Sequence, residues 1–146
     1  MSDLTDDELR ALPLGRLLLQ AHRRAQAASL AKLQASGHAE IRLGHVPVIT
    51  NLDPEGTRIT DLAARAGMTR QMMGRLVKEL EAIGYVRLRP HETDLRAVVV
   101  TLTELGERFR AEAPVAMAAV DRDFAQLLGP SELANLREML LRISKS

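Results

Sequence analysis

The sequence lacks cysteine and tryptophan and has only one tyrosine and two phenylalanines among its 146 residues. Without cysteine, the protein can form no disulfide, no thiolate metal site and no thiol redox switch. Without aromatic bulk, the interior must be filled by leucine, alanine, valine, isoleucine and methionine, which favours a helical protein. The length fits one compact domain over residues 1–146 with its own hydrophobic core.

Membrane and enzyme signals are also missing. No apolar run is long enough to cross a bilayer, and the acidic start, with Asp6, Asp7 and Glu8, is unlike a signal peptide. We therefore expect a cytoplasmic protein without a membrane partner. The patterns GxSxG and HExxH, the phosphate loop and zinc-ligand spacings are absent, so we expect no enzyme activity and no cofactor.

The net charge of the protein is uninformative, but the charged residues are distributed unevenly along the chain. Lysine and arginine number 20 and aspartate and glutamate 19, a formal net charge of +1. Between residues 57 and 96, eight basic side chains face five acidic ones, whereas each flank is slightly acidic. A basic centre between acidic arms fits a phosphate-contacting module held between scaffold helices.

Apolar periodicity predicts helices at both ends of the chain. A capping box at Thr5 starts the first, and a long helix is expected from residue 14 to 35. A shorter helix should lie within 41–52. After the cap Thr103 comes a helix that Pro114 should kink or split, and Gly129-Pro130 precedes a last helix.

The centre of the chain predicts a helix-turn-helix. Thr60-Asp61 can cap a short helix, and the turn at Gly67 leads to a second helix capped by Thr69. In the second helix Met73, Leu76, Val77, Leu80 and Ile83 should form the inner face. The side chains expected to face outward and to contact DNA, together with the cap, are Thr69, Arg70, Gln71, Met72, Gly74, Arg75 and Lys78. Arginine suits guanine, glutamine suits adenine and lysine suits phosphate.

A β-hairpin is expected directly after this helix. Residues 85–89 alternate apolar and basic side chains, residues 97–102 are rich in valine, and the loop between them has the sequence of residues 90–96. Such a hairpin is a wing, and an arginine at its tip can enter the narrow minor groove. The candidate DNA contacts here are Arg87, Arg89, Asp94 and Arg96.

Segment 61–106, DLAARAGMTRQMMGRLVKELEAIGYVRLRPHETDLRAVVVTLTELG, resembles the core of the MarR (multiple antibiotic resistance regulator) family. The matching pieces are Leu62-Ala63, the run from Arg75 to Val86, the wing pair Asp94 and Arg96, and the stretch from Leu102 to Gly106. The usual wing reads D-R-R, and here Leu95 replaces the first arginine, which removes one expected phosphate contact.

The resemblance implies a single MarR-like domain, mainly α with a small β-hairpin wing, whose DNA-binding unit spans residues 57–102. It implies dimerisation through helices within residues 5–36 and 104–146, which the helical periodicity at both ends supports. It further implies a homodimer that binds a pseudo-palindromic operator in double-stranded DNA, usually as a repressor released by a small aromatic or amphipathic effector. His22 and His45 are the candidate effector contacts, because the helices that carry them line the family's effector pocket.

Several features also have simpler interpretations. Arg70, Arg75 and Lys78 could be an ordinary solvated helix face, although the adjoining wing favours DNA contact. Gly74 either permits close DNA approach or is merely tolerated. A metal at His91, Glu92 and Asp94 is disfavoured because an exposed loop is poorly preorganised, so these side chains should remain in solvent. The alternative functions are a winged-helix module for protein contact and a metal-sensing regulator of related fold.

Overall fold

The computed structural model describes residues 4–94 and 96–146, and the chain forms two compact units. One unit, called here the terminal-helix unit, contains the residues up to Ser29 and residues Met117–Ser146. The other, called the central unit, contains Leu30–Ala116. The helices α2 (Leu14–Ala35) and α6 (Glu104–Leu128) each contribute to both units. The expected mainly α fold with a small β wing is confirmed.

The terminal-helix unit is built from the helices expected at the two ends of the chain. It begins with α1 (Asp6–Arg10), where Thr5 and Glu8 form the predicted reciprocal capping box. The long helix α2 has the bounds that the sequence indicated. The last helix, α7 (Pro130–Ser144), starts after Gly129, with proline in its first turn. Among the described residues of this unit, Val120 is the one apolar side chain that is buried.

Pro114 was expected to kink or split its helix, and α6 runs through Pro114 as one helix, so it is not split there, while a kink stays a prediction. A proline inside a helix removes one backbone hydrogen bond and disfavours the turn before it. On either side of Pro114, however, α6 buries Phe109, Ala116 and Val120. The packing of this apolar face outweighs the local cost of the proline.

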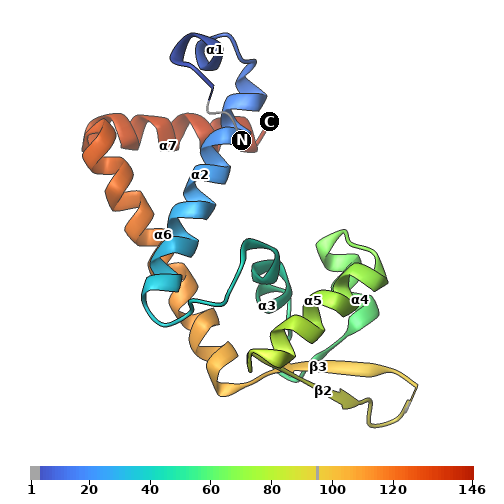
Figure 1. Ribbon diagram of the computed structural model, residues 1–146. Helices are drawn as coiled ribbons and strands as arrows, with labels where there is room; N and C mark the ends of the chain where they lie inside the picture. Colours follow the sequence, from blue (N-terminus) through green and yellow to red (C-terminus); the bar gives the residue numbers. More distant parts are fainter. Residues whose placement is uncertain (1–3, 95) are drawn as a thin grey trace. The chain divides into compact units, whose positions relative to one another are not determined.

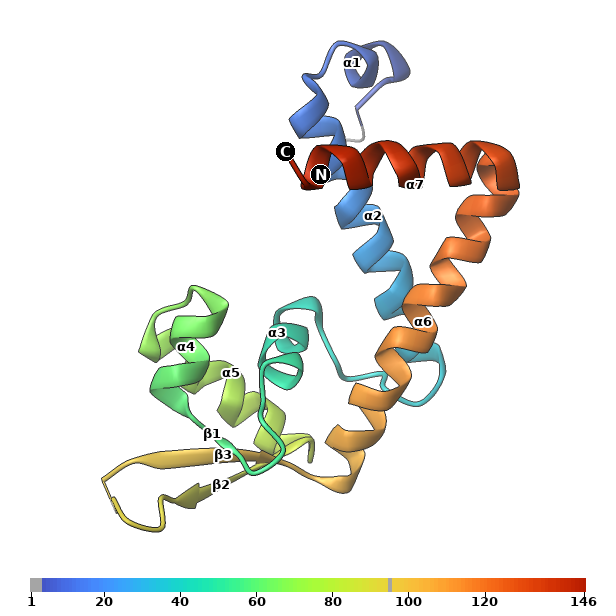
Figure 2. The same ribbon diagram turned by 180° about the vertical axis from the view of Figure 1, so that it is seen from behind.

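The central unit contains the predicted helix-turn-helix and wing, which lie side by side in both views (Figure 1, Figure 2). A 3-10 turn, η1 (Leu43–His45), leads into α3 (Val46–Thr50), which has Pro47 in its first turn. The remaining elements are β1 (Thr57–Arg58), α4 (Ile59–Ala66), α5 (Arg70–Ala82), β2 (Val86–Pro90) and β3 (Val98–Leu102).

The sheet of the central unit has three strands, one more than the hairpin that we expected. Its order is β1-β3-β2, with both neighbours antiparallel to β3. The extra strand pairs Thr57 with Val100 and Arg58 with Val99. The N-cap of α4 is Arg58, two residues before the expected Thr60 cap, and it makes no side-chain hydrogen bond to the helix.

The mainly apolar core of the central unit includes a buried histidine, His38, that the sequence did not single out. His38 is fully buried, with its Nδ1 2.7 Å from the Tyr85 hydroxyl and its Nε2 2.6 Å from Oε2 of Glu112. An ionised carboxylate can only accept, so Nε2–H donates to Glu112, and a neutral ring then accepts at Nδ1 from the Tyr85 hydroxyl. Burial raises the pKa of Tyr85, which keeps its hydroxyl protonated as a donor. The ring thus joins the start of the wing to α6.

Candidate nucleic-acid interface

The second helix of the helix-turn-helix, α5, is anchored by its inner face and by its cap. The side chain of Thr69 accepts a hydrogen bond of 3.1 Å from the amide of Met72, which confirms the predicted cap. Met73, Val77 and Leu80 are fully buried, as the apolar spacing indicated. The inner face therefore fixes which side chains point outward.

The outward side of α5 carries most of the expected DNA contacts. Arg70, Gln71, Met72, Arg75 and Lys78 are all exposed, and Gly74 is half-buried. An open hollow of about 580 Å³ on this side is lined by Gln71, Gly74, Arg75, Lys78, Glu79 and Ala82. Donors from three successive turns of the helix therefore converge on one surface.

Gly74 has free space where a side chain would stand. A Cβ built at this position would meet no atom of the described residues within 4 Å. No packing contact within the central unit therefore requires glycine in the middle of α5. Both explanations of this residue, close approach of DNA and simple tolerance, remain predictions.

The tip of the wing is shaped by Asp94. Its Oδ1 accepts a hydrogen bond of 3.1 Å from the amide of Arg96, and its carbonyl accepts one from the amide of Ala97. The Arg96 side chain is exposed. Leu95, expected to lack a phosphate contact, lies outside the described residues. Asp94 thus acts within the turn, where it sets the direction of Arg96.

A cleft of about 310 Å³, called here the wing–helix cleft, separates the wing from the helix-turn-helix. It is lined by Arg58, Ile59, Thr60, Arg70, Asp94, Arg96, Ala97 and Val98. The structure thus brings together Arg70, Asp94 and Arg96 from the expected set. It adds Arg58, whose only signal in the sequence was its place in the basic centre of the chain.

The other two wing arginines border different hollows. Arg89 donates a hydrogen bond of 2.8 Å to the carbonyl of Glu55 and faces a pocket on the β1 side of the sheet. Arg87 is exposed and lines an open hollow beside the start of α6, together with Arg108. Neither lines the wing–helix cleft, so the expected wing contacts do not form one surface.

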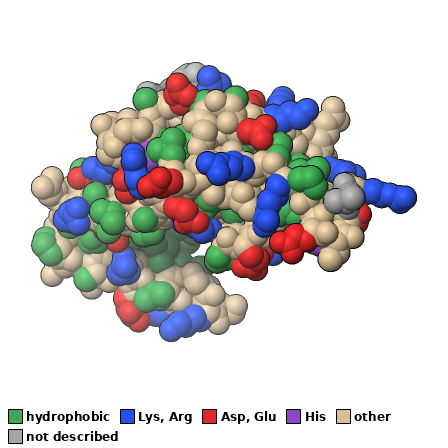
Figure 3. Space-filling view, turned by 90° about the horizontal axis from the view of Figure 1, so that it is seen from below, with side chains coloured by type: hydrophobic (Ala, Val, Ile, Leu, Met, Phe, Trp, Pro, Cys, Tyr) green, Lys and Arg blue, Asp and Glu red, His purple; other side chains and the backbone are tan. Residues whose placement is uncertain are grey.

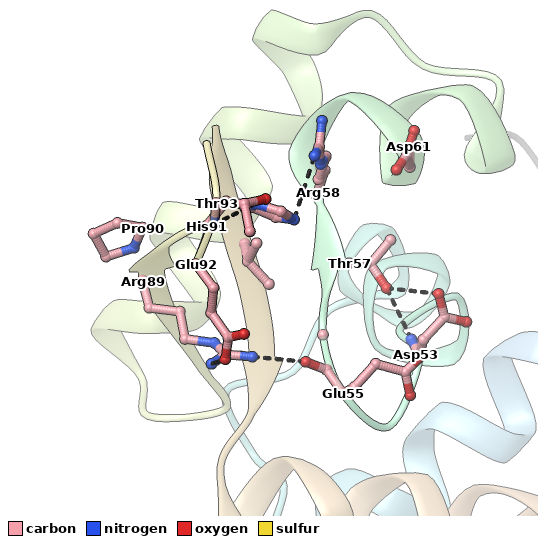
Figure 4. A pocket seen from close by; sticks show the side chains of 12 residues that line it. Asp53, Glu55, Thr57, Arg58, Asp61, Arg89, Pro90, His91, Glu92 and Thr93 are labelled. Atoms are coloured by element: carbon pink, nitrogen blue, oxygen red, sulfur yellow. Dashed lines mark hydrogen bonds and ion pairs between the residues drawn. The ribbon is translucent and has the colours of Figure 1, made fainter. Parts of the chain in front are cut away.

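The pocket beside Arg89 shows how the wing is tied to the strand β1 (Figure 4). Nε2 of His91 lies 3.3 Å from Nη2 of Arg58, and Nδ1 of His91 lies near the amides of Thr93 and Asp94. The expectation that His91 remains in solvent was therefore wrong. The ring is half-buried because the extra strand β1 brings Arg58 against it.

His45, one of the two candidate effector contacts, is buried with both ring nitrogens engaged. Nδ1 accepts from the amide of Arg42, so Nε2 carries the proton and donates to Oε2 of Glu79 at 2.8 Å. This hydrogen bond lowers the pKa of the Glu79 carboxyl below its ordinary value. His22, the other candidate, is exposed on α2. The contacts of His45 give it a structural role, and effector binding at either residue stays a prediction.

The substitution Glu79→Gln should remove a stabilising interaction that depends on pH. A carboxyl whose pKa is lowered by folding stabilises the protein above its unfolded-state pKa of about 4.3. That contribution is lost as the pH falls through the lower folded-state value. In urea unfolding, the wild type should be more stable than the variant at about pH 7, and the difference should shrink below about pH 4.

The matched control is Glu138→Gln, at an exposed position of α7. A pH-independent difference between the wild type and Glu79→Gln would show that the hydrogen bond to His45 is not the cause.

The surface around these sites mixes both signs of charge. In Figure 3, basic and acidic side chains alternate over the visible face, so no continuous basic surface is seen. Within the described residues, no group of three or more His, Cys, Asp or Glu side chains could hold a metal ion. None of the helices described is both long enough and apolar enough to pass through a membrane.

Two helices joined by a tight glycine turn and followed by a small antiparallel sheet define a winged helix-turn-helix. Residues 41–97 match the model of the MarR family. The resemblance seen in the sequence is therefore confirmed, and the chain has the fold of MarR-family transcriptional regulators, which are not enzymes.

Solved structures of similar proteins support this assignment. AbsC, a MarR family transcriptional regulator from Streptomyces coelicolor, is 28% identical, with 99% of this chain and 97% of that chain covered and a TM-score of 0.63. The reduced form of MarR from E. coli is 19% identical, with coverages of 90% and 96% and a TM-score of 0.77. YusO from Bacillus subtilis is 16% identical, with coverages of 98% and 99% and a TM-score of 0.72. No curated protein sequence matches the chain.

Proposed function

We propose that this protein is a cytoplasmic transcriptional repressor that binds a pseudo-palindromic operator as a homodimer. One observation carries the proposal. The exposed polar face of α5 lies next to a wing whose Arg96 borders the same cleft as Arg70. A helix of this kind fits the major groove, and an arginine on a wing fits the adjacent minor groove.

Dimerisation is supported by the apolar surface of the terminal-helix unit. The helix α7 buries none of its residues, and Leu136, Met139, Leu141 and Ile143 are all exposed. A soluble chain rarely leaves so many large apolar side chains uncovered on one helix. A second copy related by two-fold symmetry would cover them and would present two recognition helices to successive major grooves.

The substitutions Arg75→Ala and Arg96→Ala should weaken DNA binding in different ways. Arg75 is assigned to a base edge or an adjacent phosphate, so its loss should cost about 1–3 kcal/mol and affect specific binding most. Arg96 is assigned to the minor groove, so its loss should weaken operators with A·T-rich flanks most. The measurement is duplex affinity against salt concentration, on fragments selected from genomic DNA, with flanks of differing A·T content.

Both variants should fold normally, because neither side chain is buried. Thermal unfolding of each variant is the control. Unchanged affinity in Arg96→Ala would remove the wing from the proposed interface, and an absence of duplex binding by the wild type would overturn the function itself.

The proposal includes release by a small aromatic or amphipathic acid, with His22 and His45 as candidate contacts. The family resemblance supports this part. For His45 to bind an effector through its ring, its hydrogen bonds to Arg42 or Glu79 would have to break. A ligand screen that reads out duplex affinity tests it, and a constitutive binder would be unaffected by every compound.

A further inference from the structure

Three arginines from three different elements line the wing–helix cleft. Arg58 comes from β1, Arg70 is the first residue of α5, and Arg96 belongs to the wing loop. One carboxylate, Asp94, lines the cleft, and it already accepts a hydrogen bond from the Arg96 amide. In residues 4–94 and 96–146, none of the three arginines has a carboxylate within ion-pair distance. Three positive side chains therefore line the cleft with one negative side chain, and a local excess of positive charge favours a bound anion.

Arg58 differs from the other two because it borders both hollows beside the wing. Its backbone is fixed in the sheet opposite Val99, and its Nη2 lies 3.3 Å from Nε2 of His91 in the pocket of Figure 4. The same residue also lines the wing–helix cleft. An arginine anchored at its backbone and steadied by a ring loses less conformational entropy when it binds a ligand.

The position of the cleft indicates which anion it would hold. In duplex DNA, the wall between a major groove and the neighbouring minor groove is one sugar–phosphate backbone. A protein that places a helix in the first groove and a wing in the second must fit that backbone between the two elements. The wing–helix cleft lies between the wing on one side and the starts of α4 and α5 on the other. A guanidinium group can donate two parallel hydrogen bonds to two oxygens of one phosphate.

We propose that the wing–helix cleft seats a phosphate of the DNA backbone and that Arg58 is a direct contact to it. This rests on the proposed DNA-binding function and adds a contact that belongs neither to the recognition helix nor to the wing. Because a phosphate carries no sequence information, the contribution of Arg58 is equal for operator and non-operator DNA.

The test needs no operator, because non-specific binding reports phosphate contacts. Affinity for a mixed-sequence duplex of about 30 base pairs is measured against salt concentration. Arg58→Ala should reduce the slope of log affinity against log salt by about 0.9 for each lost contact, or about twice that in a dimer. Arg58→Lys should keep most of the slope because the charge remains. Arg58→Gln serves as the second neutral variant if Arg58→Ala folds poorly.

Two further variants separate direct contact from indirect effects. Arg108→Ala removes an exposed arginine of α6 that lines a different hollow, so its slope should stay near that of the wild type. His91→Ala removes the ring that steadies Arg58 but leaves the charge, so its slope should also be kept. If His91→Ala reproduced the loss seen in Arg58→Ala, the arginine would act by anchoring the wing, and the proposal would be overturned.

The remaining outcomes distinguish a phosphate of the DNA backbone from a free phosphate ion. They also separate a failure of this proposal from a failure of the proposed function. Duplex affinity is compared in chloride and in inorganic phosphate at equal ionic strength, and we expect no difference. Competition by free phosphate in the wild type but not in Arg58→Gln would make the cleft a site for a small anion instead. A wild type that binds duplex with the same slope as Arg58→Gln overturns this proposal alone, whereas a wild type that binds no duplex overturns the proposed function.

Discussion

Ending the chain after Leu128 should abolish dimerisation and reduce duplex affinity at least about a hundredfold, the low end of the gain from two linked sites. The truncation removes all of α7, with its exposed apolar side chains. The core of the central unit is formed without α7, so the helix-turn-helix should still fold. Sedimentation velocity gives the oligomeric state, and duplex titration gives the affinity.

A less disruptive variant tests the same prediction if the truncated chain does not fold. Leu136→Glu combined with Ile143→Glu keeps α7 but places charge on its apolar side, and it should also produce monomers. A well-folded dimer in the truncated protein would mean that α7 does not form the interface.

The substitution Gly106→Ala should destabilise the central unit by about 3 kcal/mol, at the upper end of the range for overpacking. A Cβ at this position would collide with the carbonyl oxygen of Tyr85 and would lie 2.9 Å from Cδ2 of Leu102. The obstacle is partly backbone, which cannot rotate away as a side chain can. Urea unfolding measures the loss, and a normal free energy of unfolding would show that α6 can shift without cost.

Gly74→Ala is the matched control, because it also replaces a glycine inside a helix. Its Cβ would stand in open space, so the variant should be more stable by about 1 kcal/mol. The two glycines should therefore respond with opposite sign. A loss of duplex affinity in the stabilised Gly74→Ala variant would assign its free space to the DNA.

The sequence predicted those features that depend on neighbouring residues. The bounds of α2, the cap at Thr69 and the buried face of α5 follow from helical periodicity and local capping. The strand β1 was missed because two residues carry no periodicity, and it exists through pairing with β3. Pro114 does not split α6, because the packing of residues far apart in the sequence outweighs a local preference.

The candidate site was also predicted only in part from the sequence. The outward residues of α5 follow from the position of its inner face. The contact between Arg58 and His91 joins residues 33 positions apart, and Glu112 lies 74 positions from His38. No spacing rule connects side chains over such distances, so these contacts required the three-dimensional arrangement.

The order of the small sheet also bears on how the protein avoids aggregation. Because β3 lies in the middle, the two outer strands expose unpaired backbone groups that could recruit a strand from another molecule. One outer strand, β1, is only two residues long, and the other, β2, carries Arg87 and Arg89 and ends at Pro90. Short length, positive charge and proline are the features that discourage edge-to-edge association. Replacing Arg87, Arg89 and Pro90 with neutral β-branched residues would therefore create an edge strand that can pair with a strand of another molecule, even in a protein whose fold was unchanged.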